Sequence, residues 1–141
     1  MIVKVKRLHD KAKLPSYAHP GDAGLDLYAP ESFTLSPGER RAVPLGISIE
    51  LPEGFAAFIK DKSGLARHHG IHNLAGVCDA GYRGEYAVVL INLGQTPVSI
   101  EVGEKISQLV IFPKPPIEVV EADELSASAR ATGGFGSTGK F

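Results

Sequence analysis

The sequence predicts an all-β fold, in which many short strands form a jelly-roll-like sandwich or barrel with at most one or two short helices. Runs rich in valine, isoleucine and aromatic residues recur at short intervals along the chain. Proline and glycine stand between these runs at 36–38, 52–54 and 95–97, where the backbone must reverse. The 141 residues, 43% of them hydrophobic, suffice to bury one continuous core.

Each element is placed by its own pattern of residues. The segments expected to be strands are 2–6, 33–35, 46–51, 55–60, 85–93, 98–102, 106–112 and 117–121. The segment PGDAGLDLYAP, residues 20–30, is expected to be a turn that leads into a further strand. Two segments are expected to be helical: 63–69, where Ser63 is a candidate N-cap, and 123–130.

Charge and composition narrow the choice of partners. Fifteen basic and 16 acidic side chains give a net charge of −1, so no overall basic field attracts nucleic acid. The one cysteine, Cys78, cannot form an internal disulfide, which fits a reducing compartment. The N-terminus lacks the apolar core of a signal peptide, and no run reaches membrane-spanning length. We therefore expect a soluble cytoplasmic protein without a nucleic acid or membrane partner.

A glycine-rich reversal at residues 76–85 lies between the strand-like segment 73–77 and a long apolar strand, which predicts a β-hairpin. Asp79, Tyr82 and Arg83 would be displayed at or near its tip. A carboxylate there can hold a water and an aromatic ring can wall off a sugar, although a hairpin aspartate is more often a turn-former. Cys78 is expected to be a small buried filler on the opposite face.

Acidic and basic residues outside the hairpin also admit two interpretations. Asp22 and Asp26 can serve a hydrated metal, or they can be solvated acids in an ordinary turn. The segment 60–71 combines a hydroxyl, a glycine and several cations at a loop-to-helix junction that offers amides to an anion. The histidines in and just after this segment have no second cluster of ligands, so we expect no structural zinc site.

The C-terminal segment has four glycines within residues 133–139 and no strand pattern. A free tail is the default expectation for such a terminus. Phe135 within this run offers the alternative, because an aromatic ring with unhindered neighbouring amides can cover a base and its phosphates.

Taken in order, these segments resemble the five motifs of the trimeric dUTPases over nearly the whole chain. The matching segments are AGLDL with its flanking Pro20-Gly21, KSGLA, NLAGVCDAGYRGE, GEKISQLV and RATGGFGSTG. The resemblance implies a homotrimer of jelly-roll subunits with active sites shared between chains and a C-terminal arm exchanged between subunits. It implies a β domain at 1–125 and a mobile glycine-rich arm at 126–141 that closes over the site.

The resemblance also implies a reaction. Asp79 would act as general base for a water that attacks the α-phosphorus of dUTP, giving dUMP and pyrophosphate. This activity would keep uracil out of DNA and supply dUMP for dTMP synthesis. Mg²⁺ would be bound mainly by the substrate phosphates, with Asp26 as a partner through water.

Substrate contacts follow from the same resemblance. Main-chain groups of Gly76 and Val77, with the side-chain amide of Asn73, would bind the uracil edge. Tyr82 would pack on the deoxyribose and exclude a 2′-hydroxyl, and Phe135 would stack on the uracil. The expected phosphate contacts are Lys62, Ser63, Gly64, Gln108, Arg130, Gly136, Ser137 and the Thr138 backbone. Lys62 departs from the arginine usual in the second motif, and lysine lacks its planar fork.

Two other functions compete with this interpretation. A deoxycytidine triphosphate deaminase shares the fold, but its family carries a catalytic glutamate and a different serine-arginine signature in the second region. A catalytically silent β-domain that binds nucleotide or assembles a shell is the other alternative, against which Asp79 and the complete arm argue.

Overall fold

The computed structural model describes residues 1–134 and residue 137. Its strands are β1 (Lys4–Arg7), β2 (Leu25–Tyr28), β3 (Phe33–Leu35), β4 (Arg40–Pro44), β5 (Ile47–Glu50), β6 (Phe55–Asp61), β7 (Ile71–Leu74), β8 (Val77–Asp79), β9 (Ala87–Asn92), β10 (Val98–Ile100) and β11 (Lys105–Pro113). The helix is α1 (Ser63–His69). The predicted contacts of Phe135, Gly136 and Thr138 lie outside the described residues.

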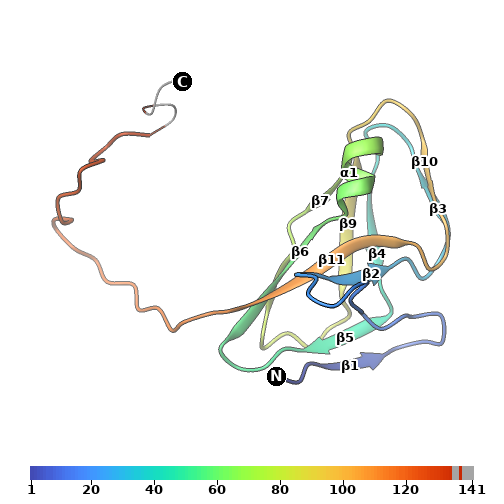
Figure 1. The fold of residues 1–141 in the computed structure, drawn as a ribbon, viewed down its shortest axis with the longest axis horizontal. Coiled ribbons are helices and arrows are strands. Elements are labelled where there is room, and N and C mark those ends of the chain that lie inside the picture. Colours follow the sequence, from blue (N-terminus) through green and yellow to red (C-terminus); the bar gives the residue numbers. More distant parts are fainter. Residues whose placement is uncertain (135–136, 138–141) are drawn as a thin grey trace.

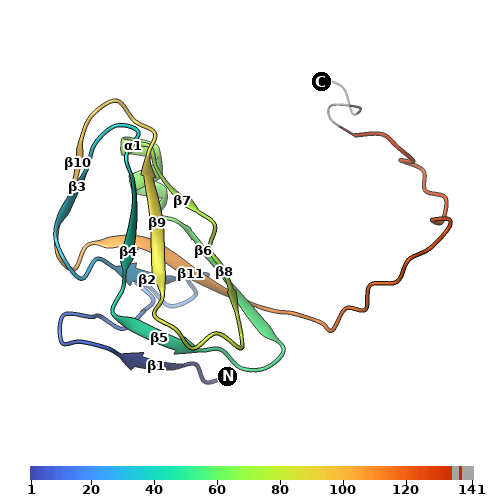
Figure 2. The ribbon, with the colours of Figure 1, turned by 180° about the vertical axis from the view of Figure 1, so that it is seen from behind.

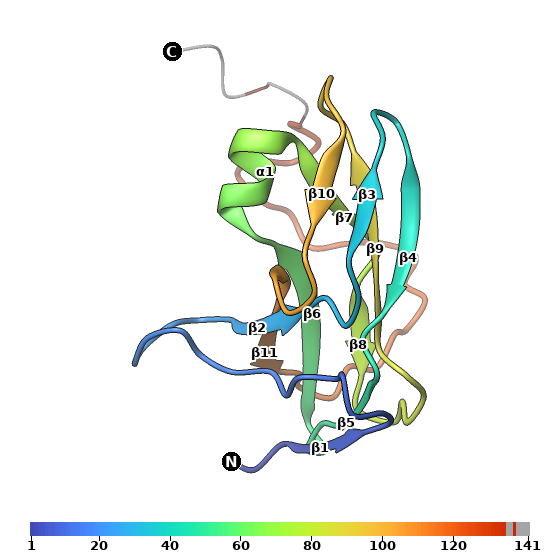
Figure 3. The same ribbon diagram turned by 90° about the vertical axis from the view of Figure 1, so that its right-hand side faces the viewer.

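The strands form two main sheets in which all neighbours are antiparallel. One sheet has the order β2-β11-β6-β8 and the other has the order β4-β9-β7. Two smaller pairs, β1-β5 and β10-β3, complete the fold. Strands β3 and β10 lie with α1 at one end of the molecule, and β1 and β5 lie at the opposite end (Figures 1 and 3). The view from behind shows β4 and β9 side by side (Figure 2). This arrangement confirms the predicted all-β class.

The core lies between the two main sheets and is built by alternating positions on the strands. Leu27 on β2 and Leu109 on β11 are each 1% exposed, and Leu90 on β9 is fully buried. Strands β3, β5 and β10 bury every second residue, as expected for strands with one face toward a core. Burial of each such leucine or isoleucine contributes about 1.5–3 kcal/mol, so this alternation stabilises the sandwich.

The helix predicted at 63–69 is confirmed. It ends at Gly70, whose φ of 72° is left-handed and whose N–H bonds to the carbonyls of Ala66 and Leu65. The predicted cap is wrong, because Lys62 occupies the N-cap position and makes no side-chain cap hydrogen bond. In the described part of the chain, no helix is long and apolar enough to cross a bilayer.

Two predictions for the segment after β11 are also wrong, since residues 117–121 form no strand and residues 123–130 form no helix. The apolar side chains of this segment find no core, and Ile117, Val119 and Val120 are 75%, 91% and 70% exposed. Without a neighbouring strand or a packed face, local propensity does not suffice for either structure. The segment runs away from the β-sandwich in an extended path (Figure 1).

Candidate active site

The chain crosses from one main sheet to the other between β7 and β8. Strand β7 pairs with β9, whereas β8 pairs with β6. Two residues with positive φ make this link, Ala75 at 61° and Gly76 at 102°. The predicted hairpin is therefore only partly correct: β7 and β9 pair as expected, but Val77–Asp79 leaves them and becomes the edge strand of the four-stranded sheet.

Gly76 is required at this crossing for two reasons. Its φ of 102° lies in a region that L side chains rarely adopt. A Cβ atom built on Gly76 would also lie 2.9 Å from the carbonyl oxygen of Ile59 and 3.0 Å from its Cβ. This closeness is useful, because the Ile59 N–H donates to the Gly76 carbonyl at 2.7 Å and fixes the start of β8 against β6.

A pocket of about 300 Å³ lies where β7, β8 and β9 meet. Apolar side chains including Ile59, Leu74 and Val88 form much of its wall, and Asp79 and Tyr82 contribute polar groups. Strand β8 is at the end of its sheet, so its outer edge has no partner strand among residues 1–134. An unpaired strand edge presents main-chain donors and acceptors, which a planar polar ligand can bind as a further strand would.

Asp79 is the last residue of β8 and is exposed at the wall of the pocket. The Tyr82 N–H donates to its carbonyl at 3.1 Å, so Asp79 also begins the turn that follows. Cys78 lies on the other face and is 9% exposed, which confirms its prediction as a buried filler. Burial is the main cause that raises the pKa of the Cys78 thiol to about 11, and the charge of Asp79 adds a smaller increase, so the thiol stays neutral and is not an activated nucleophile.

Tyr82 and Arg83 lie in the turn between β8 and β9. The Tyr82 hydroxyl donates to the Glu85 carbonyl at 2.9 Å, and the residue as a whole is 49% exposed. The guanidinium of Arg83 folds back onto the same turn and donates to the carbonyls of Ala80 and Tyr82. Arg83 therefore stabilises the turn, whereas the exposed ring of Tyr82 is available to a ligand.

Tyr86 lines the same pocket and was not singled out from the sequence. It is 3% exposed, and its hydroxyl has no hydrogen-bond partner among the described residues. Burial raises the pKa of this hydroxyl to about 12, so it remains a neutral donor. Tyr86 could have been found in the sequence, because it alternates with Val88 and Leu90, which are buried. Residues at alternate positions of a strand point to the same face, so Tyr86 also points inward.

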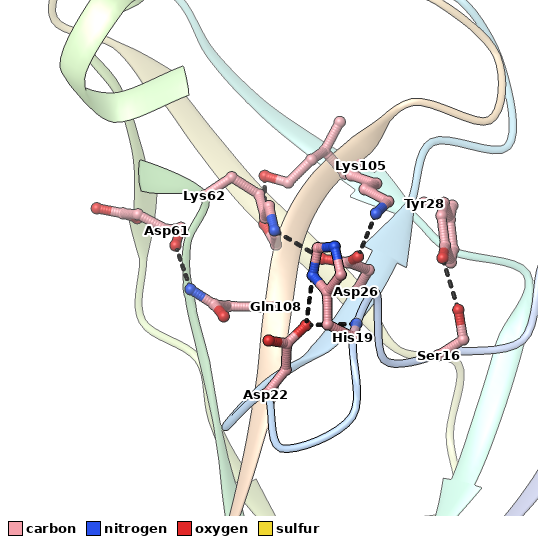
Figure 4. Close-up of polar contacts among 11 residues, drawn as sticks. Ser16, His19, Asp22, Asp26, Tyr28, Asp61, Lys62, Lys105 and Gln108 are labelled. Atoms are coloured by element: carbon pink, nitrogen blue, oxygen red, sulfur yellow. Dashed lines mark hydrogen bonds and ion pairs between the residues drawn. The ribbon is translucent and has the colours of Figure 1, made fainter. Parts of the chain in front are cut away.

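A second polar cluster surrounds Asp26 (Figure 4). Asp26 is 2% exposed, so the prediction of a solvated acid is wrong for it, whereas Asp22 forms the predicted turn by accepting the His19 N–H at 2.8 Å. One oxygen of Asp26 lies 2.7 Å from the ammonium of Lys62 and the other lies 2.7 Å from that of Lys105. Burial raises the pKa of Asp26, but the adjacent ammonium groups of Lys105 and Lys62 outweigh burial and lower it below its usual value.

Gln108 joins this cluster from β11, directly across from Asp26. Its side-chain amide donates to the main-chain carbonyl of Asp61 at 2.8 Å. A Cβ atom on Gly24 would lie 2.4 Å from the Gln108 Oε1 atom, so Gly24 leaves the space that this carboxamide occupies. Ser63 and Gly64 begin α1 beside it, ahead of the first helical hydrogen bond from the Ala66 N–H to the Lys62 carbonyl.

Asn73 lies apart from the pocket, in a network inside the β-sandwich. Its side-chain amide donates to Asp61 at 3.1 Å and accepts from the Ser107 hydroxyl at 2.9 Å. Burial raises the pKa of Asp61, but hydrogen bonds from His72 and Asn73 outweigh burial and lower it. The structure thus engages the Asn73 side chain internally, rather than presenting it at the pocket where a uracil contact was expected.

Within one chain, the pocket and the Asp26 cluster are separate. Asp79 pairs with Ala56 at one end of β6, whereas Gln108 pairs with Lys60 near the other end. Four residues of strand span about 13 Å. The remaining predicted phosphate ligands that the structure describes, Arg130 and Ser137, lie in the C-terminal segment that runs away from the β-sandwich (Figures 1 and 2).

The described residues offer no set of direct ligands for a metal ion. Among residues 1–134 and residue 137, no three histidine, cysteine, aspartate or glutamate side chains gather around one point. Both oxygens of Asp26 already contact lysine ammonium groups. A hard cation such as Mg²⁺ would therefore need oxygen ligands from a bound substrate and from water.

The fold and the site together define a class of protein. It is a jelly-roll-like β protein that combines an apolar pocket, bordered by a free strand edge and a carboxylate, with a separate lysine-rich cluster suited to anions.

Comparison with known proteins names the family. The dUTPase family model matches residues 10–139. A deoxyuridine 5'-triphosphate nucleotidohydrolase of Thermobifida fusca is 54% identical, with 97% of this chain and 78% of the relative covered. One from Gloeobacter violaceus is 49% identical, with 97% and 96% covered. The dUTPase of Staphylococcus bacteriophage 80alpha, solved with dUPNHPP, superimposes with a TM-score of 0.93 at 28% identity, and 98% of each chain is covered. The chain belongs to the dUTPase family, as its five motifs predict.

Proposed function

We propose that this protein is a dUTP diphosphatase, which hydrolyses dUTP to dUMP and pyrophosphate and so keeps uracil out of DNA. The observation that carries the proposal is the pocket at β8, where an exposed aspartate, Asp79, borders an apolar cavity beside an unpaired strand edge. The family match over residues 10–139 and the relatives of about 50% identity support the choice of substrate.

In the proposed reaction, Asp79 takes a proton from a water that attacks the α-phosphorus. Its position fits this role, because a general base must reach the attacking water at the border between the pocket and solvent. The Cys78 thiol behind it is buried and neutral, so we propose direct attack by water rather than a covalent intermediate on cysteine.

We propose that the pocket selects deoxyuridine by main-chain and steric contacts. Main-chain groups of Gly76 and Val77 at the edge of β8 would bind the uracil edge, which distinguishes an acceptor at the 4-position from the amino donor of cytosine. Leaving one buried hydrogen-bonding group unpaired costs about 1–3 kcal/mol. The exposed ring of Tyr82 would pack on the deoxyribose and leave no room for a 2′-hydroxyl. The Asn73 side chain is bonded to Asp61 and Ser107 in this chain, so the proposed uracil contact of its amide requires these hydrogen bonds to open.

The triphosphate would be bound by polar groups around the Asp26 cluster and by the C-terminal segment. The proposed contacts are Lys62, Ser63, Gly64, Gln108, Arg130, Gly136 and Ser137. When bound, Mg²⁺ neutralises charge on the leaving pyrophosphate. The substrate phosphates would hold this ion, and Asp26 would reach it through water.

We further propose that the active protein is a cytoplasmic homotrimer with shared sites. The pocket and the Asp26 cluster lie at separate places on one chain, and we propose that each site combines the pocket of one chain with the cluster of another. Sedimentation should give three times the chain mass of 14.9 kDa. A monomer mass at working concentration would exclude the shared site.

A nucleotide panel tests the proposed function. The protein is incubated with Mg²⁺ and dUTP, dCTP, dTTP or UTP, while pyrophosphate and ammonia are followed together. We expect pyrophosphate from dUTP, little turnover of the other three nucleotides, and no ammonia. Ammonia from dCTP would identify a deaminase instead, and the absence of any product would identify a binding domain.

A further inference from the structure

Asp26 is a buried carboxylate that contacts two cations from different parts of the chain. Lys62 is the N-cap residue of α1 and Lys105 is the first residue of β11, and each ammonium lies 2.7 Å from a different oxygen of Asp26 (Figure 4). The side chains of Lys62 and Lys105 are 28% and 43% exposed, whereas that of Asp26 is 3% exposed. Both lysines therefore reach from the surface to the same buried anion.

The two lysines exceed what the carboxylate needs. One cation is enough to neutralise Asp26, so the three side chains together carry a net positive charge. A buried carboxylate that lost its only cation would be strongly destabilised, because little water can replace the partner. With two cations, one lysine can leave while the other keeps Asp26 ionised.

The backbone indicates which lysine can leave. Lys105 is paired with Tyr28 in the ladder between β11 and β2, so its backbone is held on the same sheet as Asp26. Lys62 lies outside the strands, between the end of β6 and the start of α1. Lys62 directly precedes Ser63. The side-chain amide of Gln108 donates to the carbonyl of Asp61, the residue before Lys62. An oligophosphate bound by these groups would lie within reach of the Lys62 ammonium.

We propose that Lys105 is a positioning residue for the phosphate site: it holds Asp26 in place and ionised while Lys62 exchanges Asp26 for the bound triphosphate. The inference rests on the proposed function, since it takes dUTP as the ligand. It explains why one buried aspartate has two lysine partners. Because Lys105 neutralises Asp26, Lys62 is available to the substrate.

Removal of Lys105 provides the test, with binding of the imido analogue dUpNHpp measured by calorimetry beside steady-state kinetics. In Lys105→Met, Lys62 must stay on Asp26, so we expect the Kd for dUpNHpp and the KM for dUTP to rise at least about tenfold, with kcat within about twofold of wild type. Lys105→Arg should keep wild-type binding. Lys4→Met is the matched control, because it breaks another lysine ion pair, with Glu50 on β5, away from the cluster.

Double variants separate positioning from a structural role. Adding Asp26→Asn to Lys105→Met removes the charge that retains Lys62, so we expect the Kd to fall back to that of Asp26→Asn alone. Lys62→Met should also weaken binding, but Asp26→Asn should not restore it, because the phosphate ligand itself is missing. If Lys105→Met does not fold, Lys105→Gln takes its place, and melting temperatures are compared for every variant.

The outcomes distinguish this inference from the proposed function. Wild-type affinity in Lys105→Met, or a double variant that binds no better than Lys105→Met, would overturn the inference while dUTP turnover by the wild type still stands. If the wild type does not turn over dUTP, the proposed function fails. The same variants are then titrated with inorganic triphosphate, and an unchanged Kd in Lys105→Met would overturn the inference as well.

Discussion

Three aspartates show how the surroundings of a residue set its chemistry. Asp79 is exposed at the wall of the pocket, where a water can reach it. Asp26 is buried between two lysines, and Asp61 accepts hydrogen bonds from His72 and Asn73. The lysines lower the pKa of Asp26 and the hydrogen bonds lower that of Asp61, in each case against the opposing effect of burial. Only the exposed aspartate is free to serve as a base.

The first prediction concerns Asp79. Asp79→Asn preserves the shape of the side chain but removes the base, so kcat should fall about 10²- to 10⁴-fold. The Kd for dUpNHpp should stay within a few-fold of wild type, as calorimetry can measure. Weaker binding with unaltered kcat would contradict the assignment of Asp79 as the base.

The second prediction concerns Gly24, whose missing side chain leaves space for Gln108. In Gly24→Ala, the new methyl group would meet the Gln108 carboxamide, which must move and lose its bond to the Asp61 carbonyl. We expect KM for dUTP to rise about tenfold, the effect of losing roughly one hydrogen bond to a charged group. In the Gln108→Ala background, Gly24→Ala should raise the KM for dUTP little further. If the two substitutions raise KM additively, the effect of Gly24 does not depend on Gln108.

At the scale of elements, the crossing between β7 and β8 builds the pocket. It requires a backbone conformation and a close approach at Gly76 that other residues cannot supply. The local sequence shows a glycine-rich reversal, but it does not show that β8 pairs with β6 rather than with β9. The pairing makes β8 an edge strand and so leaves main-chain groups free for a ligand.

Gly76→Ala should therefore destabilise the fold more than an ordinary loop glycine substitution. The clash with Ile59 and the strained φ together should cost about 2–4 kcal/mol in the free energy of unfolding. Gly54→Ala is the matched control, because Gly54 has a φ of 78° but open space around it, and should cost about 1–2 kcal/mol. Urea unfolding measures both, and equal losses would show that the close approach to Ile59 is unimportant.

The segment after β11 is the other element whose role can be tested. Its apolar side chains are exposed, so it adds little to the core of its own chain. Removal of residues 131–141 should leave the melting temperature and the number of chains in the assembly, measured by sedimentation, unchanged, while kcat/KM for dUTP falls about 10²-fold through lost positioning of the substrate. Dissociation of the assembly after this truncation would show that the tail is structural.

At the scale of the whole molecule, the buried Asp26 and the partly buried Asp61 contact residues from other segments of the chain. The folded-state pKa values of Asp26 and Asp61 are both lowered from 3.8. Groups with a lowered folded-state pKa stabilise the protein above their unfolded pKa, and this stabilisation is lost as pH falls through the folded pKa. Acid should therefore weaken the fold through these two sites.

We expect the melting temperature to be nearly constant from pH 7 to pH 5 and to fall steadily below about pH 4. Asp26→Asn should be less stable at pH 7 and should show a flatter decline in acid. Asp10→Asn, in the exposed turn after β1, changes the net charge equally and should keep the wild-type profile. A profile for Asp26→Asn as steep as that of wild type would mean that the buried carboxylate does not contribute to the acid response.

The segments that could be predicted from the sequence are those whose structure is determined by residues close together in the chain. Strand β11 and helix α1 lie where the apolar runs and turn residues place them, and Gly70 ends the helix as a left-handed cap. Strand β4 was missed, because the two arginines and the proline in RRAVP hide a segment that is held mainly by its pairing with β9. The strand expected at 117–121 failed for the opposite reason, since its β-forming residues have no neighbouring strand.

The sequence by itself determined the all-β class, the turns, helix α1 and the motifs that identify the dUTPase family, because these depend on composition and on residues near one another in the chain. Only the tertiary structure decided that Asp26 is buried between Lys62 and Lys105, that the Asn73 side chain turns inward, and that the pocket lies apart from the Asp26 cluster. The separation of the pocket from the Asp26 cluster, like the other two features, depends on which strands pair and in which register, and hence on contacts between residues far apart in sequence.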